Sequence, residues 1–168
     1  MPAFLTYDSS EVCELVGIGP LLLNKFVERK TYGIQPSVRS GKGRGGRRLF
    51  SPDDVLGIAL VWWLFEAGLR SGVIQYVLDQ ICKPTKGAAS EAAKKLVKRN
   101  IQTLVIGYRP GVNEPRLKIP PSRLVELIAE ESPNVSRNVS MELRIHVGFL
   151  YSPLIDKMKR LTGLPEGE

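Results

Sequence analysis

The sequence predicts an α+β fold, in which a mainly helical N-terminal half with a β-hairpin precedes a small α+β domain with a mostly antiparallel sheet. Segments with helical apolar spacing and helix-cap residues dominate the first half, whereas runs of β-branched residues follow Cys82. With 168 residues, of which 43% are hydrophobic and 24% charged, the chain has the composition of an ordinary globular protein. We divide it into residues 1–82, a linker and short basic helix at residues 83–100, and a C-terminal domain at residues 101–168.

Two short helices are predicted near the N-terminus. Ser9 or Ser10 is suited to cap the first, which contains EVCELV, and Gly17 is suited to end it. A second helix begins at Pro20, because proline lacks the N–H that would stay unpaired in a first helical turn. Two short helices a few residues apart form a helix-turn-helix pattern, which occurs in DNA-binding proteins and in many other helical proteins.

A glycine-rich cationic loop follows in the stretch SGKGRGGRRLFSPDDV, residues 40–55. Its four glycines permit the backbone angles that the tip of a two-stranded hairpin requires. Val38 on one side, and Leu49 and Phe50 on the other, are apolar enough to lie in the flanking strands. Ser51, a proline and two aspartates then predict the start of the next helix.

The next helix is apolar on nearly all sides from Val55 to Phe65, so it must be buried within its own domain or against a second subunit. The adjacent Trp62 and Trp63 fit either core packing or a dimer contact. Gly68 breaks this helix, and a fourth begins near Ser71 with one apolar face.

The second half alternates helical and strand patterns. The predicted elements are a linker at residues 83–90, a short basic helix at 91–100, a buried strand at 101–108, a second strand at 116–120, an amphipathic helix at 122–131, an alternating strand at 139–148 and a final helix around 152–161.

Positive charge is concentrated in one segment. The chain has a net charge of +7, and the segment from Lys25 to Arg48 holds eight basic residues and one acid, so the rest sums to zero. Such a segment is either a solvated basic loop or a footprint for phosphates. In a winged helix-turn-helix protein, the second helix enters the major groove and the hairpin, called the wing, lies along the DNA backbone. The predicted DNA-binding residues are Leu22, Asn24, Lys25, Arg29, Lys30, Arg39, Lys42, Arg44, Arg47 and Arg48.

Taken in order, SSEVCELVGIGPLLLNKF, GRRLFSPDDV and LFEAGLRSGVIQYVL resemble the DNA-binding domain of the mercury-resistance-type (MerR) regulators over roughly the first 82 residues. Gly46 to Ser51 matches that family's Gly-Tyr-Arg-Leu-Tyr-Ser wing, with arginine and phenylalanine replacing its two tyrosines. Glu66 to Leu69 matches the turn into its fourth helix. Asn24, Lys25 and Phe26 stand where the family usually has Arg-Tyr-Tyr, and the family's long dimerisation helix and cysteine-bearing loop are not visible after Cys82. The resemblance implies a winged helix-turn-helix, a homodimer and binding to promoter DNA.

Other reactive residues have ordinary interpretations. Cys13 falls on an apolar helix face and is expected in the core, and Cys82 is a bystander or, beside Lys83, a thiol of lowered pKa. His146 falls on the polar phase of its strand and is expected in solvent. The basic residues of the helix at 91–100 form a solvated face or touch flanking DNA. With no catalytic set, metal cluster or nucleotide-binding glycine motif, we expect no enzyme, no metal and no cofactor.

The sequence therefore predicts a bacterial-type transcriptional regulator that binds double-stranded DNA as a homodimer. We expect it in the cytoplasm, associated with the nucleoid, because no signal peptide and no membrane-spanning run is present. An alternative is an architectural or excisionase-like protein that bends DNA. A second alternative is an enzyme or protein-interaction module that the basic domain tethers. Any small-molecule effector is left unidentified by the sequence, as are the target site and the direction of control.

Overall fold

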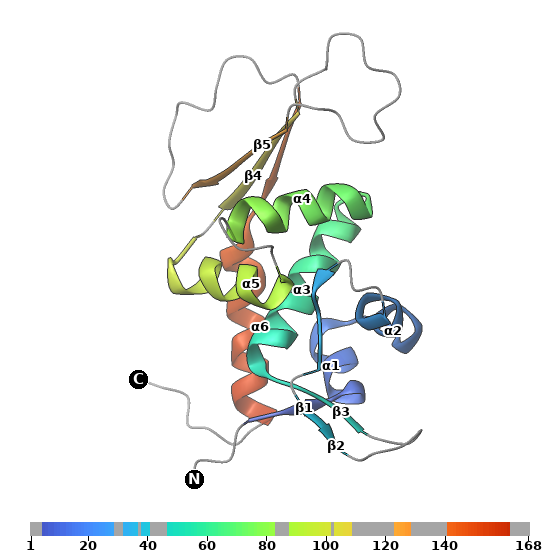
Figure 1. Ribbon diagram of the computed structural model, residues 1–168. Helices are drawn as coiled ribbons and strands as arrows, with labels where there is room; N and C mark the ends of the chain where they lie inside the picture. The colour runs from blue at the N-terminus through green and yellow to red at the C-terminus, as the bar shows by residue number, and fades with distance from the viewer. Residues whose placement is uncertain are drawn as a thin grey trace.

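Helices form the middle of the molecule and a three-stranded antiparallel sheet lies at each end (Figure 1). The computed structural model describes residues 5–28, 32–36, 38–40, 47–82, 88–101, 103–108, 123–128 and 141–161, with the backbone alone described at 38–40, 105–108, 123–128 and 141–143. Within these ranges the predicted α+β class is confirmed. In chain order the elements are β1 (Tyr7–Asp8), α1 (Ser9–Val16), α2 (Pro20–Glu28), β2 (Val38–Ser40), β3 (Arg47–Phe50), α3 (Pro52–Glu66), α4 (Ser71–Cys82), α5 (Ala89–Lys98), β4 (Thr103–Tyr108), β5 (Arg123–Ile128), β6 (Met141–Ile145) and α6 (Val147–Leu161).

The first sheet contains the predicted hairpin. Strands β2 and β3 pair antiparallel, with Val38 opposite Leu49, and β1 adds to the other edge of β3 through Tyr7 opposite Phe50. The two-residue strand β1 was not predicted, because it is too short to show an alternating pattern. The predicted glycine-rich hairpin tip, residues 41–46, lies outside the described residues.

The cap of α1 differs from the prediction. Asp8, and not Ser9 or Ser10, is the N-cap: its carboxylate accepts hydrogen bonds from the backbone N–H groups of Ser10 and Glu11. Both serines lie inside the first helical turn, where Asp8 and Glu11 complete a reciprocal capping box. The predicted end at Gly17 is confirmed, with a left-handed φ of 75°.

Helix α3 is the centre of the hydrophobic core. Nine of its fifteen residues are buried, and its predicted start at Ser51 is confirmed by a capping box with Asp54. Helix α5 crosses α3 so closely that a Cβ at Gly57 would lie 2.5 Å from the Ser90 backbone nitrogen. The Ser90 hydroxyl donates to the Asp54 carboxylate at 2.9 Å at the same crossing. Of the two predicted alternatives for this helix, burial within its own chain is therefore the observed one.

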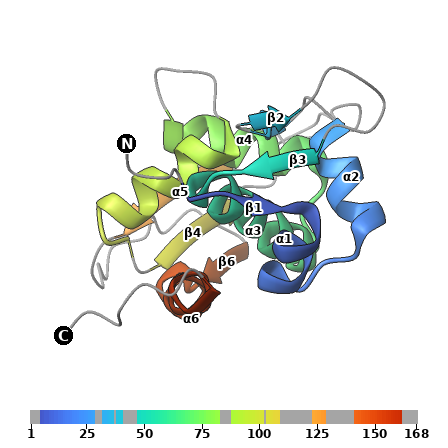
Figure 2. The same cartoon turned by 90° about the horizontal axis from the view of Figure 1, so that it is seen from below.

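Helix α6 closes the core from the other side. The Trp63 ring packs against Tyr151 of α6 with centroids 4.9 Å apart, and the Tyr7 hydroxyl donates to the Met158 carbonyl oxygen. Figure 2 shows α6 end-on beside α1, on the side of the molecule away from β2 and β3. The core is thus built jointly by the N-terminal helices and the C-terminal helix, since buried residues of both belong to one cluster.

The second sheet corrects one prediction. Residues 122–131 were expected to form an amphipathic helix, but β5 occupies Arg123–Ile128 and pairs antiparallel with β4, whose other edge pairs with β6. The apolar residues of RLVELI fit a helical stripe and a strand equally well, so pairing with distant residues decides the conformation. Strands β4 and β6 are confirmed, whereas the strand predicted at 116–120 lies outside the described residues. Two boundaries also move: the last two residues of the predicted linker lie in α5, and α6 begins at Val147.

We expect Gly57→Ala to lower the free energy of unfolding by about 2–3 kcal/mol, because the added methyl group meets the α5 backbone, which cannot rotate aside. Urea unfolding followed by circular dichroism measures this loss. Gly19→Ala is the matched control, since a Cβ there has no neighbour within 4 Å. Equal losses in the two variants would contradict the close crossing of α3 and α5.

Candidate nucleic-acid interface

Helix α2 has one buried face and one exposed face. Leu23 and Phe26 are 2% and 3% exposed and point into the core. The side chains of Leu21, Asn24, Lys25 and Glu28 are exposed, and their spacing places them on a single stripe of the helix. We call this stripe the outer face of α2; it combines an apolar group, an amide, a cation and an acid.

Aromatic packing fixes the direction of the outer face. The Phe26 ring meets Tyr32 edge-on with centroids 5.7 Å apart and Phe65 at 6.2 Å. The Tyr32 hydroxyl in turn donates to the Ser71 hydroxyl oxygen at 2.9 Å. Because Phe65 lies in the last turn of α3 and Ser71 begins α4, these contacts hold α2 against two helices of the hydrophobic core.

A hydrogen bond between side chains joins the hairpin to α2. The Arg48 guanidinium, on β3, donates to the Asn24 side-chain oxygen at 2.9 Å. The side-chain oxygen of Asn24 is therefore engaged within the chain. The remaining polar groups of the pair, which are the Asn24 amide N–H groups and the other N–H groups of Arg48, are all hydrogen-bond donors. The pair, with Lys25 beside it, is a donor-rich surface of the kind that pairs with phosphate or with the acceptor edge of guanine.

The structure brings some of the predicted DNA-binding residues together. Asn24 and Lys25 lie on the outer face of α2, Arg48 is half-buried beside Asn24, and Arg47 is exposed on β3. Arg39 lies directly opposite Arg48 in the β2–β3 ladder. The predicted residues outside the described ranges are Arg29, Lys30, Lys42 and Arg44.

Leu22, which the sequence analysis assigned to the DNA interface, is less exposed than its neighbour Leu21. Leu22 is half-buried and packs against the core, whereas Leu21 is 80% exposed on the outer face. The helical periodicity of α2 would have predicted this difference in exposure. Leu22 and Leu23 lie four and three residues before the core residue Phe26, but Leu21 lies five residues before it and so turns outward.

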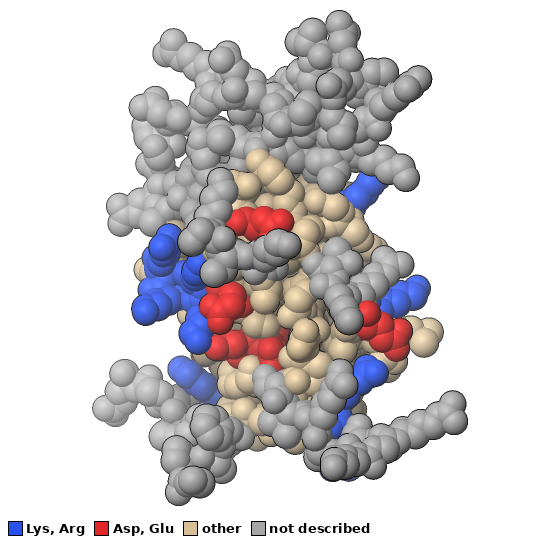
Figure 3. Space-filling model, viewed as in Figure 1, with Lys and Arg blue, Asp and Glu red and all other residues tan. Residues whose placement is uncertain are grey.

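The lysine-rich helix α5 is partly engaged within the chain. Lys94 forms an ion pair with Asp53 at 3.3 Å, and the Lys95 ammonium donates to the Cys82 carbonyl oxygen at 3.2 Å, at the end of α4. Lys98 and Arg99 are exposed. In Figure 3, basic residues gather at the edge of the molecule where α5 lies and alternate with acidic ones elsewhere on that face. The mixture of signs there is less suited to a phosphate footprint than the hairpin is.

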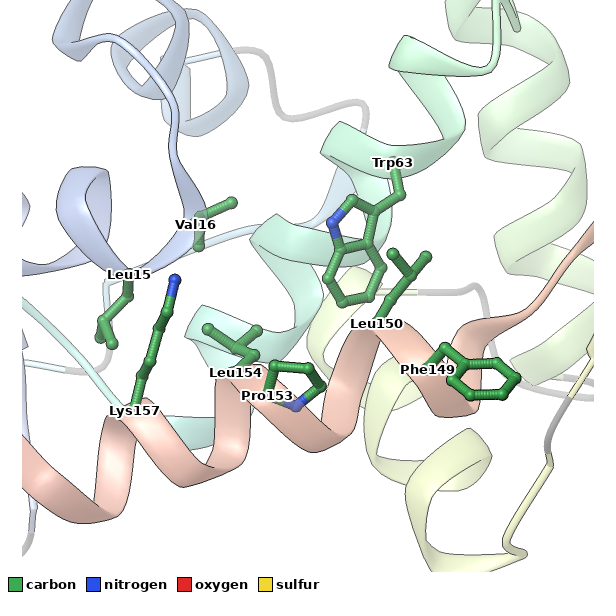
Figure 4. Close-up of a pocket in the computed structure, with 8 residues that line it drawn as sticks. All are labelled: Leu15, Val16, Trp63, Phe149, Leu150, Pro153, Leu154 and Lys157. Atoms are coloured by element: carbon green, nitrogen blue, oxygen red, sulfur yellow. The ribbon is translucent and has the colours of Figure 1, made fainter.

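A shallow apolar groove of about 220 Å³ lies where α6 passes α1 and α3. Its walls include Leu15, Trp63 and Leu154, with the Lys157 side chain over one end (Figure 4). Phe149 stands at the other end, where its ring points away from Trp63 and is 81% exposed. The groove lies on the α6 side of the molecule, away from the hairpin.

The two thiols are poor candidates for chemistry. Cys82 is buried, and burial raises its thiol pKa although the Lys95 ammonium acts in the opposite direction. Cys13 is half-buried at the edge of the core, where partial burial also raises its pKa. His146 is exposed as predicted, with its Nδ1 atom 3.2 Å from the Thr103 hydroxyl oxygen. Among the described residues, no group of three His, Cys, Asp or Glu side chains could hold a metal ion.

No protein-family model matches the chain, and no curated protein is significantly similar to it. In the part of the chain that the structure describes, no helix is long and apolar enough to cross a membrane.

In the native protein we expect one thiol to react slowly with Ellman's reagent. The second thiol should react only after the protein is unfolded. Cys13 is half-buried and Cys82 is buried, and raised pKa values keep both as thiols at neutral pH, where the thiolate is the reacting species. The labelling rate of Cys13 should therefore keep rising with pH above the pH at which the labelling rate of an ordinary thiol becomes constant. Cys13→Ser is the control and should abolish native-state labelling; rapid labelling of Cys82 would contradict its burial.

Proposed function

We propose that the chain is a transcriptional regulator that binds double-stranded DNA as a winged helix-turn-helix protein. In this proposal α1 and α2 are the helix-turn-helix, α2 enters the major groove and the β2–β3 hairpin is the wing. The observation that carries it is the hydrogen bond from Arg48 to Asn24, because it joins the outer face of α2 and the first strand residues after the glycine-rich loop into one surface. The resemblance of the first 82 residues to the MerR regulators supports the same assignment.

The order and geometry of the elements favour this function. Gly17 ends α1 in a left-handed conformation and α2 begins three residues later, as in a helix-turn-helix. Recognition helices of this kind place their N-terminal residues against base edges. In α2, Leu21 lies in the first turn, and Asn24 and Lys25 follow it on the same exposed face. The outer face therefore begins at the end of the helix that the proposed docking requires.

Charge supports the hairpin as the phosphate-binding part. Arg39 and Arg48 are opposite each other in the β2–β3 ladder and Arg47 adjoins them, so the hairpin carries three arginines on neighbouring positions. Lys25 adds a cation on α2, and Glu28 is the acid at the far end of that helix. Arginine binds phosphate through several N–H donors, and each such contact releases condensed counterions from the DNA.

The homodimer is part of the proposal, and α6 is the element that suits it. Helix α3, which the sequence offered as a possible subunit contact, is buried within the chain. On α6, the exposed Phe149 ring stands beside the apolar groove, so one face presents both a projecting group and a recess. An isologous dimer requires such a self-complementary face. A contact there would leave α2 and the hairpin available to DNA (Figure 2).

We expect the full chain to bind a duplex from the region upstream of its own coding sequence more tightly than a scrambled duplex of equal length, as measured by fluorescence anisotropy over a series of salt concentrations. Arg48→Ala should weaken binding to the preferred duplex about tenfold or more, because it removes donors and releases Asn24. Lys25→Ala should weaken both duplexes alike and reduce the log-log salt slope by about 0.9.

Lys98→Ala is the matched control for these charge removals, because Lys98 is an exposed lysine on α5. It should keep the wild-type affinity and salt slope. A loss of DNA affinity in Lys98→Ala and none in Arg48→Ala would place the DNA-binding surface on α5. Absence of binding at low salt would reject the proposed function. Equal affinity for both duplexes would favour the alternative of an architectural DNA-bending protein.

Sedimentation velocity tests the dimer. We expect the wild-type chain to sediment as a dimer and Phe149→Ser to shift it toward monomer, because the substitution removes an apolar ring that is 81% exposed in the single chain. Val97→Ser, on α5, is the control and should leave the dimer intact. A wild-type monomer both alone and bound to DNA would contradict the proposal.

A further inference from the structure

Leu21 is a large apolar side chain in an unusual place. It is 80% exposed in the first turn of α2, while the neighbouring Leu22 and Leu23 pack inward. It lies three and four residues before Asn24 and Lys25, so it shares the outer face with an amide and a cation. Nothing in the core requires a leucine there, since the side chain points away from it.

We propose that Leu21 is a specificity-determining residue that contacts the C5 methyl group of a thymine in the major groove. This inference rests on the proposed function and goes beyond it by naming a base feature that α2 reads. Of the groups that base edges present in the major groove, the thymine methyl is the apolar one. An exposed leucine at the N-terminal end of a helix that enters this groove is therefore matched to it in chemistry and in position.

The neighbouring side chains strengthen this assignment. The Asn24 oxygen already accepts a hydrogen bond from Arg48, so this pair offers donors to the DNA and no apolar surface. Lys25 is a cation, suited to a phosphate or to acceptor atoms. Leu21 is thus the member of the outer face that can distinguish a methylated pyrimidine edge from a bare one, while the donors beside it favour an adjoining acceptor edge or phosphate.

Removal of single methyl groups from the DNA tests the proposal. The full chain is first used to select binding duplexes from a library with a randomised segment of about thirty base pairs, long enough for two half-sites. Each thymine of the selected site is then replaced in turn by deoxyuridine, which lacks only the C5 methyl group. We expect at least one replacement to weaken wild-type binding about fourfold, the factor for one methyl group withdrawn from an apolar contact.

Leu21→Ala completes a double-mutant cycle with the same duplexes. It should bind the thymine duplex about fourfold or more weakly than wild type and show no further loss with deoxyuridine at the contacted position. Because Leu21 is exposed, its thermal unfolding midpoint should match that of wild type. Val97→Ala, which shortens an exposed apolar side chain on α5, is the control and should retain the full fourfold penalty for deoxyuridine.

The outcomes separate this inference from the proposed function. If a site is selected but every deoxyuridine penalty is the same for wild type and Leu21→Ala, the chain binds DNA and the assignment of Leu21 is wrong. An unchanged DNA affinity of Leu21→Ala would likewise reject it and would direct Leu21 toward a protein partner. If no sequence is enriched from the library, the proposed function fails and the inference fails with it.

Discussion

The close crossing of α3 and α5 is the constraint on which the arrangement of the interface depends. Gly57 lets the two backbones approach, and the Asp54 carboxylate binds Ser90 of α5 and Ser51 at its own helix start. Since Ser51 directly follows β3, the same carboxylate that docks α5 also fixes where β3 ends. The buried Asp54 thereby determines where the hairpin ends and α3 begins.

A chain of contacts carries this constraint to the surface. Phe50 of β3 is fully buried, and Arg48, two residues earlier on the same strand, reaches Asn24 of α2. Helix α2 is held independently by Phe26 against Tyr32 and Phe65. The outer face of α2 and the base of the hairpin are thus held in place by separate core contacts, and the hydrogen bond from Arg48 to Asn24 joins them. For a DNA-binding protein this matters, because a helix in a groove and a wing on the backbone must keep a fixed spacing.

Local signals in the sequence predicted much of this arrangement, and distant contacts account for most of what they missed. Pro20, Ser51 and Gly17 marked helix ends correctly because capping depends on residues a few positions apart. Strand β5 was taken for a helix because its apolar residues satisfy both periods, and its pairing partner β4 lies some twenty residues away. The crossing at Gly57 could not be foreseen either, since a lone glycine in an apolar helix does not show which backbone approaches it. The exception is Leu21, whose outward phase could have been read from the sequence.

The hairpin and the outer face of α2 contain different kinds of chemical group, which suit them to different parts of the DNA. The hairpin is arginine-rich, and Leu49 and Phe50 of β3 are half-buried and buried, so it suits a backbone that is the same in every DNA sequence. The outer face of α2 mixes an apolar side chain, an amide and a cation, which is the variety that base edges require. Affinity and sequence preference would then reside largely in different side chains, and the hydrogen bond from Arg48 to Asn24 would couple the hairpin to α2. Loss of a phosphate contact, such as the one proposed for Lys25, should alter affinity at every sequence, whereas a change at Leu21 should alter the ranking among sequences.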